Sequence, residues 1–229
     1  MSETVSFLSN GHSAAGHLAV PSLGRGPAVI VIQEWWGLNP QIKRTADMLA
    51  THGLVALAPD LYHGELAAHD EMDKAGHLMS SLPPDRAARD MSGAVDFLAE
   101  HPAVTGSGIG VIGFCMGGML TFILAANRGD RIKAAVPFYG FPQGDGQPDY
   151  SGLTAVVRGH MSASDDFFPA EAAKALEAQL KGMGKDVSIE LHEAGHGFMN
   201  EENPMGTYDE ALAERLWPEI IDFFKTTLA

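Results

Sequence analysis

A cysteine in a glycine-rich segment is the first residue that could carry out chemistry. The segment Gly113-Phe114-Cys115-Met116-Gly117-Gly118 lies between an apolar run typical of a buried strand and a stretch typical of a helix. It matches the nucleophile-elbow pattern G-x-S-x-G, with cysteine in the serine position. Such a turn lifts the side chain above the sheet at a helix N-terminus, where the helix dipole favours the reactive thiolate. A lone cysteine is more often a small buried hydrophobic residue, but the glycines around Cys115 favour a nucleophile.

An acyl-transfer nucleophile needs a base, and the base needs an orienting acid. In α/β-hydrolases these residues follow in the order nucleophile, acid, histidine. Asp165 and Asp166 come after one predicted strand, and His196 follows the next one in an Ala-Gly-His-Gly-Phe segment. A loop histidine is usually a surface residue, and an aspartate just before a helix often caps it. The order and the strand ends agree together, so we predict that one of the two aspartates, His196 and Cys115 act together.

The end of the first buried strand holds a further group of candidates, Gln33-Glu34-Trp35-Trp36-Gly37. The backbone amide after this strand is expected to form an oxyanion hole with the amide of Met116. Glu34 is either a solvated carboxylate or a functional one, and its place between an apolar strand and two tryptophans favours function. Trp35 and Trp36 either wall a pocket or cover the sheet, and the sequence leaves both interpretations open.

Two motifs match known sites but stand in the wrong context. His192-Glu-Ala-Gly-His196 matches the zinc-protease string H-E-x-x-H, which works only on a helix, where positions i and i+4 share a face. This segment is predicted to continue a strand, which would hold the two imidazoles about 13 Å apart. Gly108-Ile-Gly-Val-Ile-Gly113 matches the dinucleotide fingerprint, yet its glycines lie before and within a strand instead of after it. We therefore expect neither a catalytic metal nor a cofactor.

The chain alternates between short apolar, β-branched runs and amphipathic stretches, which predicts a mostly parallel sheet with helices on both faces. The predicted parallel strands are Pro27–Gln33, Leu54–Pro59, Ile109–Phe114, Ile132–Pro137, Leu153–Arg158 and Val187–His192. The predicted helices are Pro40–His52, Pro83–Glu100, Met116–Asn127, Pro169–Leu180 and Tyr208–Phe224. Val5–Leu8 and Leu18–Pro21 are expected to add antiparallel strands at one edge. No linker or repeat divides the chain, so we expect one α/β domain over residues 1–229.

Composition narrows the possible partners. The 229 residues are 45% hydrophobic and 19% charged, an ordinary globular balance. The net charge of −14 disfavours nucleic acid and anionic membranes as partners. The single cysteine suits a reducing compartment, and Met1 is not followed by a secretory signal, so a cytoplasmic location is expected. The oligomeric state is left open, with a monomer compatible with the sequence.

Together these residues resemble the dienelactone hydrolase family of α/β-hydrolases, from about Ala28 to the C-terminal helix. The shared markers are Gln33-Glu34 with Gly37, Pro59-Asp60-Leu61-Tyr62, Gly113 to Gly118, Asp165 with Phe168-Pro169, and Ala194 to Phe198.

The resemblance implies a triad of Cys115, His196 and Asp165, because the family's acid lies four residues before the proline. It also implies that Glu34 contacts the resting thiol and helps to activate it when substrate binds. The amides of Met116 and Trp35 would hold the oxyanion. On the same ground, the residues expected to contact substrate are Trp36, Tyr62, Phe198 and Asn200.

The sequence departs from the family at the residues that recognise substrate. Dienelactone hydrolases bind the substrate carboxylate with two arginines, one after the Asp-Leu-Tyr marker and one four residues beyond the catalytic histidine. In this chain residues 61–85 contain Lys74 but no arginine, and the second position is Asn200. We therefore expect neutral substrates to compete well with carboxylated ones, with Arg86 or Arg89 as the remaining sources of positive charge.

The sequence thus predicts a hydrolase that opens a small-molecule lactone or carboxylic ester through a thioacyl–enzyme intermediate. The alternative within the same class is a general carboxylesterase or thioesterase that acts on neutral substrates. A hydrolase-like binding protein without catalysis is a different class, and the filled catalytic positions argue against it. A zinc peptidase is a third class, which would require stoichiometric metal.

Overall fold

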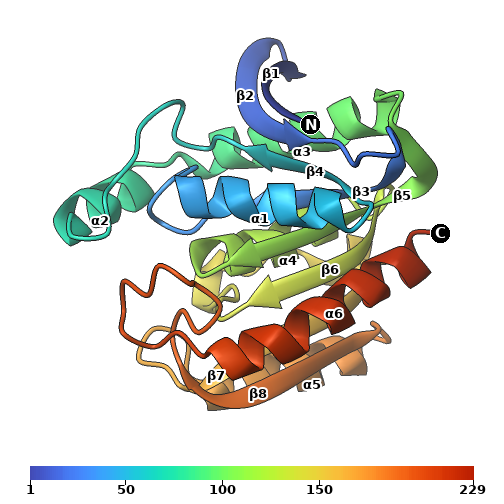
Figure 1. Cartoon of the computed structure of the whole chain (residues 1–229). Helices are drawn as coiled ribbons and strands as arrows, with labels where there is room; N and C mark the ends of the chain where they lie inside the picture. The colour runs from blue at the N-terminus through green and yellow to red at the C-terminus, as the bar shows by residue number, and fades with distance from the viewer.

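The computed structural model describes residues 1–229 and shows an eight-stranded sheet in the order β1-β2-β4-β3-β5-β6-β7-β8 (Figure 1). The strands are β1 (Ser2–Ser9), β2 (His12–Ala19), β3 (Gly26–Ile32), β4 (Val55–Pro59), β5 (Val104–Phe114), β6 (Ile132–Phe138), β7 (Val156–Ser164) and β8 (Val187–Gly195). β3 to β8 run parallel, whereas β1 and β2 form an antiparallel hairpin at one edge. The α/β-hydrolase architecture and the antiparallel edge predicted from the sequence are both confirmed.

Two layers of helices cover the sheet. The helices are α1 (Pro40–Thr51), α2 (Met72–Ser80), α3 (Pro84–Glu100), α4 (Met116–Asn127), α5 (Ala170–Gly182) and α6 (Glu210–Thr227). α1 and α6 bury their apolar sides on one face, and α3, α4 and α5 bury theirs on the other. β3 shows why this works, because Ala28, Ile30 and Ile32 enter one core while Val29 and Val31 enter the opposite one. None of the six helices combines the length and the hydropathy of a membrane-spanning segment.

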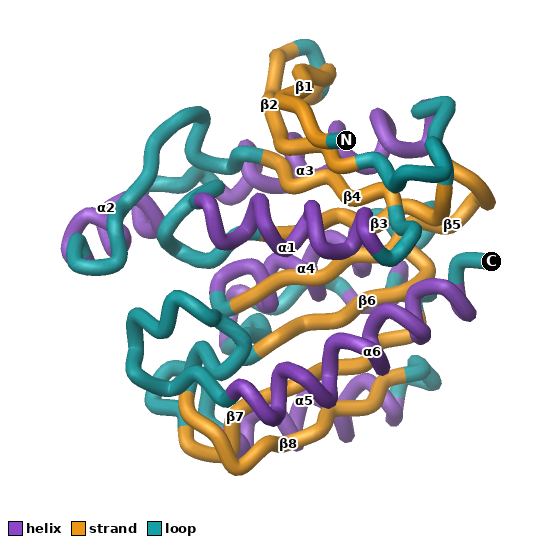
Figure 2. Tube along the Cα trace, viewed as in Figure 1, coloured by secondary structure: helices purple, strands orange, loops and turns teal.

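The carboxyl ends of the parallel strands lie at one edge of the molecule, where Figure 2 shows long loops. Every candidate catalytic residue lies at this edge. Cys115 follows β5, Glu34 follows β3, Asp165 follows β7 and His196 follows β8. The topology alone therefore brings together residues that are far apart in the sequence.

Several predicted boundaries were wrong. The strand expected at Leu153–Arg158 is β7, which starts at Val156 and continues to Ser164, and the strand expected to end at His192 continues to Gly195. The extension of β7 contains His160, Ser162 and Ser164, and the extension of β8 contains Glu193 and Gly195, which hide the apolar signal of a strand. They are held by pairing between β7 and β8, and the Ser162 hydroxyl also donates to the Gly195 carbonyl at 3.0 Å.

One helix was not predicted at all. α2 is only nine residues long, has Gly76 at its centre and lacks a side-chain cap, so its sequence signal is weak. It nevertheless buries Ala75 and Leu78 and supplies Met79 to the wall of the cavity described below.

Candidate active site

Cys115 occupies a sharp turn between β5 and α4. Its backbone has φ 56° and ψ −116°, a conformation that residues with a Cβ rarely adopt. The turn is possible because its neighbours lack side chains: a Cβ on Gly113 would lie 2.1 Å from the Gly117 carbonyl oxygen. A Cβ on Gly140 would lie 1.9 Å from the carbonyl oxygen of Cys115 itself. The structure therefore has the strained strand–turn–helix geometry of a nucleophile elbow.

His196 lies directly after β8 and pairs with Asp165. The His196 Nδ1 and Asp165 Oδ2 atoms are 2.8 Å apart, and the Asp165 side chain is fully shielded from solvent. Asp165 Oδ1 also accepts hydrogen bonds from the backbone amides of Phe167 at 2.9 Å and Phe168 at 3.1 Å. Burial would raise the pKa of Asp165, but the bonds from His196 and these amides outweigh it and lower the pKa. No hydrogen bond or ion pair joins Asp166 to His196.

The imidazole of His196 is held in an aromatic cage. Phe168 stacks on it with ring centroids 5.9 Å apart, while Tyr139 and Phe167 meet it edge to face. Burial alone would lower the pKa of His196. The hydrogen bond with Asp165 and the interaction with the Cys115 sulfur outweigh burial and raise that pKa to about 10. The imidazole is therefore held in its charged form between an acid and the cysteine.

Glu34 is buried beside this group, with 4% of its surface exposed. Its Oε1 accepts a hydrogen bond from the Tyr139 hydroxyl at 3.2 Å, and its Oε2 accepts one from the Asn200 side-chain amide at 2.8 Å. Burial raises the pKa of Glu34, and these two bonds offset only part of that effect. No hydrogen bond joins Glu34 to Cys115, in contrast to the contact that the family resemblance implied.

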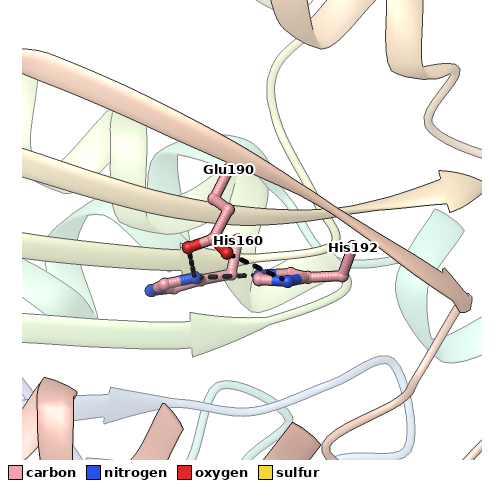
Figure 3. Close-up of side chains that lie close together, drawn as sticks. All are labelled: His160, Glu190 and His192. Carbon is pink, nitrogen blue, oxygen red and sulfur yellow. Dashed lines mark hydrogen bonds and ion pairs between the residues drawn. The ribbon is translucent and has the colours of Figure 1, made fainter.

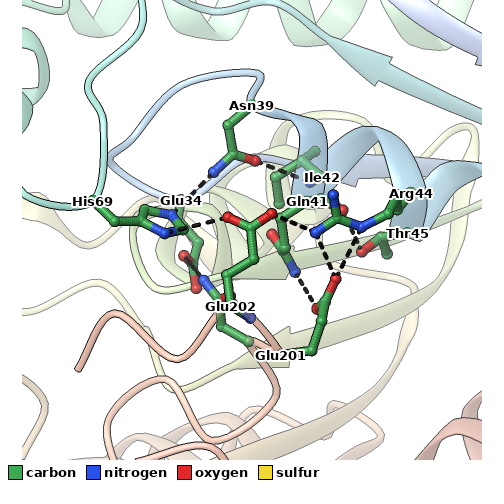
Figure 4. Close-up of polar contacts among 10 residues, drawn as sticks. Glu34, Asn39, Gln41, Ile42, Arg44, Thr45, His69, Glu201 and Glu202 are labelled. Carbon is green, nitrogen blue, oxygen red and sulfur yellow. Dashed lines mark hydrogen bonds and ion pairs between the residues drawn. The ribbon is translucent and has the colours of Figure 1, made fainter. Parts of the chain in front are cut away.

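A polar network holds the loop after β8 against α1 (Figure 4). The Asn200 side-chain oxygen in this loop accepts a hydrogen bond from the Glu202 backbone amide at 3.1 Å. Arg44 of α1 forms ion pairs with Glu201, at 3.0 Å, and with Glu202. The loop after β8 is thereby tied to α1, and Asn200 is presented to Glu34 from a fixed direction.

Two backbone amides point to an oxyanion hole. The amides of Trp35 and Met116 donate no hydrogen bond to any acceptor within the protein. Trp35 is held in place from behind, because the Tyr62 hydroxyl donates to its carbonyl oxygen at 3.1 Å. Two free amides beside a cysteine, one of them (Met116) at the N-terminus of α4 and the other (Trp35) in the loop after β3, can stabilise a negative oxygen.

A cavity of about 320 Å³ opens onto Cys115 and His196. Its walls are mostly apolar and sulfur-rich, and they contain no lysine or arginine. The lining residues are Glu34, Trp35, Trp36, Met79, Cys115, Met116, Met119, Gln143, Phe167, Phe168, His196, Gly197, Asn200, Pro204 and Met205.

Only some of the residues expected to contact substrate line the cavity. Trp35 and Trp36 both line it, so the tryptophans wall a pocket. Asn200 lines it as well, although its amide is engaged with Glu34. Tyr62 and Phe198 do not line it, which corrects the expectation from sequence. Tyr62 instead supports Trp35, and Phe198 is completely buried in the core.

The distant cations do not reach the cavity either. Lys74 pairs with Glu71 on the surface, Arg89 pairs with Asp85, and Arg86 contacts only the Leu61 carbonyl. None of the three lysine or arginine side chains considered from the sequence is among the lining residues.

Sequence reasoning missed Tyr139, which contacts both Glu34 and His196. Tyr139 directly follows β6, with φ 33°, so it stands at the same sheet edge as the other candidates. A tyrosine after a predicted strand was therefore a usable signal. Met79 and Met205 were also missed. Met79 lies on α2 and Met205 lies in a long loop, and only the tertiary structure places these two segments beside the cavity.

Neither motif set aside from the sequence lies in the context that its function needs. All three glycines of the dinucleotide-like string lie within β5, including Gly108, which was expected just before the strand. His192 lies within β8 and His196 after it, so the two histidines of the zinc-protease-like string are not on a helix.

Comparison with known proteins supports one family. The model of the dienelactone hydrolase family matches residues 14–228. The chain is 35% identical over its whole length to the protein usf of Aquifex pyrophilus, which is also covered completely. It is 31% identical to a carboxymethylenebutenolidase from a Pseudomonas species, over 82% of this chain and 80% of that protein. The crystal structure of a dienelactone hydrolase-like promiscuous phosphotriesterase from metagenomic libraries has a TM-score of 0.84 at 25% identity, and covers 100% of this chain and 99% of that one.

Proposed function

Because the chain belongs to the dienelactone hydrolase family and is a carboxylic ester hydrolase, we propose that Cys115, His196 and Asp165 form its catalytic triad. The observation that carries this proposal is the 2.8 Å bond between His196 and a fully shielded Asp165, next to a cysteine in a strained turn. Asp165 orients the imidazole and stabilises its charged form. The mostly apolar cavity supplies space for a small ester or lactone.

In the proposed reaction, the Cys115 thiolate attacks the carbonyl carbon and the carbonyl oxygen becomes negative. The amides of Met116 and Trp35 donate hydrogen bonds to that oxygen. The intermediate collapses to a thioester, and the leaving alkoxide takes a proton from the His196 imidazolium. In a lactone the alkoxide remains tethered to the acyl group, so the ring opens.

A water molecule then completes the cycle. Neutral His196 removes a proton from the water as it attacks the thioester carbonyl. The second tetrahedral intermediate expels the Cys115 thiolate and releases a carboxylic acid. His196, protonated again, pairs with the thiolate for the next turnover.

We propose that Glu34 assists the thiol without a hydrogen bond to it in the resting site. Its carboxylate and the His196 imidazolium attract each other through their charges, which favours the ion-pair form of the triad. Tyr139 and Asn200 position the carboxylate for this role.

The absence of lysine and arginine from the cavity wall favours neutral substrates. A carboxylated lactone would find no guanidinium to replace its water shell, since Asn200 offers a dipole without a countercharge. The second candidate function, a general carboxylesterase or thioesterase, is favoured by the same apolar wall.

Trapping the acyl group tests the proposal. Rapid mixing with an activated ester, followed by acid quench and mass spectrometry, should show one acyl group on the peptide that contains Cys115. The Cys115→Ala protein should show none. A hydrolase-like binding protein would bind the ester without a covalent adduct and without turnover, and that result would contradict the proposal.

A further inference from the structure

His192 belongs to the zinc-protease-like string, which would pair it with His196. In the structure His192 pairs with His160 instead. β7 and β8 pair in parallel with His160 opposite Glu190 and Ser162 opposite His192. The His160 Nδ1 and His192 Nε2 atoms are 3.1 Å apart. Figure 3 shows the two rings edge to edge, with the Glu190 carboxylate beside both.

The geometry points to a binding site for a divalent transition metal such as Zn²⁺, formed by His160, Glu190 and His192. One ligand atom from each residue lies within 4.8 Å of the others. Imidazole and carboxylate are ligands that zinc prefers, and bonds of about 2.0–2.1 Å in a tetrahedron place ligand atoms about 3.3–3.4 Å apart. The 3.1 Å separation of the two nitrogens and the 3.9 Å between His160 Nδ1 and Glu190 Oε2 are close to that spacing.

The two imidazoles are held inside the protein. His160 and His192 are both buried, with 8% and 5% of their surfaces exposed.

An ion can reach His160 and Glu190 from solvent. Both line a cleft of about 260 Å³ beside α6, together with Arg158, Ser188 and Glu219. Three protein ligands and an accessible cleft leave a coordination position for water.

Arg215 of α6 is the group that competes with the metal. Its Nη2 lies 3.2 Å from Glu190 Oε1 and 3.5 Å from His192 Nδ1. While Arg215 donates to Nδ1, the single ring proton of His192 is on Nε2 and points at His160. Metal binding needs that proton to move to Nδ1, with Arg215 displaced and no net release of a proton. The arginine side chain is 46% exposed, and such exposed ion pairs contribute little, so the displacement is feasible.

A metal at this place would hold together β7 and β8, the two strands that directly precede Asp165 and His196, without touching the triad. The proposed metal site does not depend on the proposed catalytic function. The probe is Zn²⁺ alone, titrated by isothermal calorimetry into the full-length Cys115→Ala protein, because Cys115 and His196 together offer a second set of zinc ligands. We expect binding of one Zn²⁺ per chain and a rise in the thermal midpoint.

Three variants in that background decide the assignment. Glu190→Gln should weaken binding more than about tenfold, whereas Glu193→Gln, the matched change on the same strand, should leave it unchanged. Arg215→Gln should tighten binding, which a purely structural histidine pair would not explain. Co²⁺ should give d–d absorption typical of nitrogen and oxygen ligands. Lack of stoichiometric Zn²⁺ binding, or equal affinities for Glu190→Gln and Glu193→Gln, would overturn the proposal.

Discussion

The side-chain amide of Asn200 donates a 2.8 Å hydrogen bond to the Glu34 carboxylate across 166 positions of sequence. Asn200 is 1% exposed and stands at the position where the family resemblance implied an arginine. The amide therefore satisfies an internal carboxylate and adds no charge to the cavity.

Substrate charge gives the first prediction. The wild type should hydrolyse a neutral lactone or its methyl ester at least as well as the carboxylated lactone, measured as kcat/KM. Asn200→Arg should shift the preference towards the carboxylated substrate by about tenfold, which corresponds to about 1.4 kcal/mol. Asn127→Arg adds the same charge on an exposed position at the end of α4 and should change nothing. A wild type that strongly prefers the carboxylated lactone would refute this view of the cavity.

The nucleophile is tested by Cys115→Ala. Turnover should fall by more than about 10³-fold, because Cys115 is the only thiol in the cavity wall and no hydroxyl side chain lines it. The thermal midpoint should stay nearly unchanged, as measured by circular dichroism. Cys115→Ser should keep trace activity at most, and substrate should protect the wild type from thiol alkylation. Full activity in Cys115→Ala would remove the central claim.

Asp165 and Asp166 offer a matched pair. Asp165→Asn keeps the shape of the side chain but removes the charge that holds the imidazolium, so kcat/KM should fall by about 10²- to 10⁴-fold. Asp166→Asn changes a neighbouring carboxylate with no bond to His196 and should cost less than about threefold. Equal losses in the two variants would mean that the acid has been misassigned.

Glu34 should matter more than a solvated carboxylate. Glu34→Gln should lower kcat/KM by about 10²- to 10⁴-fold, since the charge is lost and the new amide must face either Asn200 or Tyr139 as a second donor. Tyr139→Phe removes one of the two bonds and should have a smaller effect in the same direction. Glu65→Gln, on the surface, is the control. Wild-type kinetics in Glu34→Gln would leave the plain triad as the mechanism.

The pKa of His196 sets the alkaline limit of activity. This pKa is raised to about 10, so the imidazolium is present at neutral pH and is lost as the pH rises through about 10. The kcat/KM profile should therefore fall on the alkaline side near pH 10. The free energy of unfolding that the raised pKa contributes is fully present below about pH 6.5. This contribution is lost as the pH rises to about 10. Histidine NMR should show a lower His196 pKa in Asp165→Asn and in Cys115→Ala, because both partners raise it in the wild type. An unchanged pKa in both variants would contradict the ion-pair description.

Features that depend on local chain geometry could be predicted from the sequence. The glycines around Cys115 indicate a tight turn, which is possible only where the adjoining residues lack side chains. The structure shows the positive φ of Cys115 that this turn requires. Apolar runs also placed the strands of the central sheet. Once parallel strands are recognised, their carboxyl ends must meet at one edge, so Cys115, Asp165 and His196 could be expected together.

Contacts between buried polar side chains could not be predicted from the sequence. Polar residues such as His160 and Ser162 concealed the second half of β7, because a strand buried between two neighbours gains its stability from pairing and not from its own pattern. Tyr62 and Phe198 were expected at the cavity and were found behind it. The Glu34–Asn200 bond and the His160–His192 pair depend on strand register and loop paths, which are decided by the packing of the whole chain. The amino-acid sequence thus determined which groups reach the active edge, and only the tertiary structure decided which of them touch, because side-chain contacts change with displacements of a single residue in register.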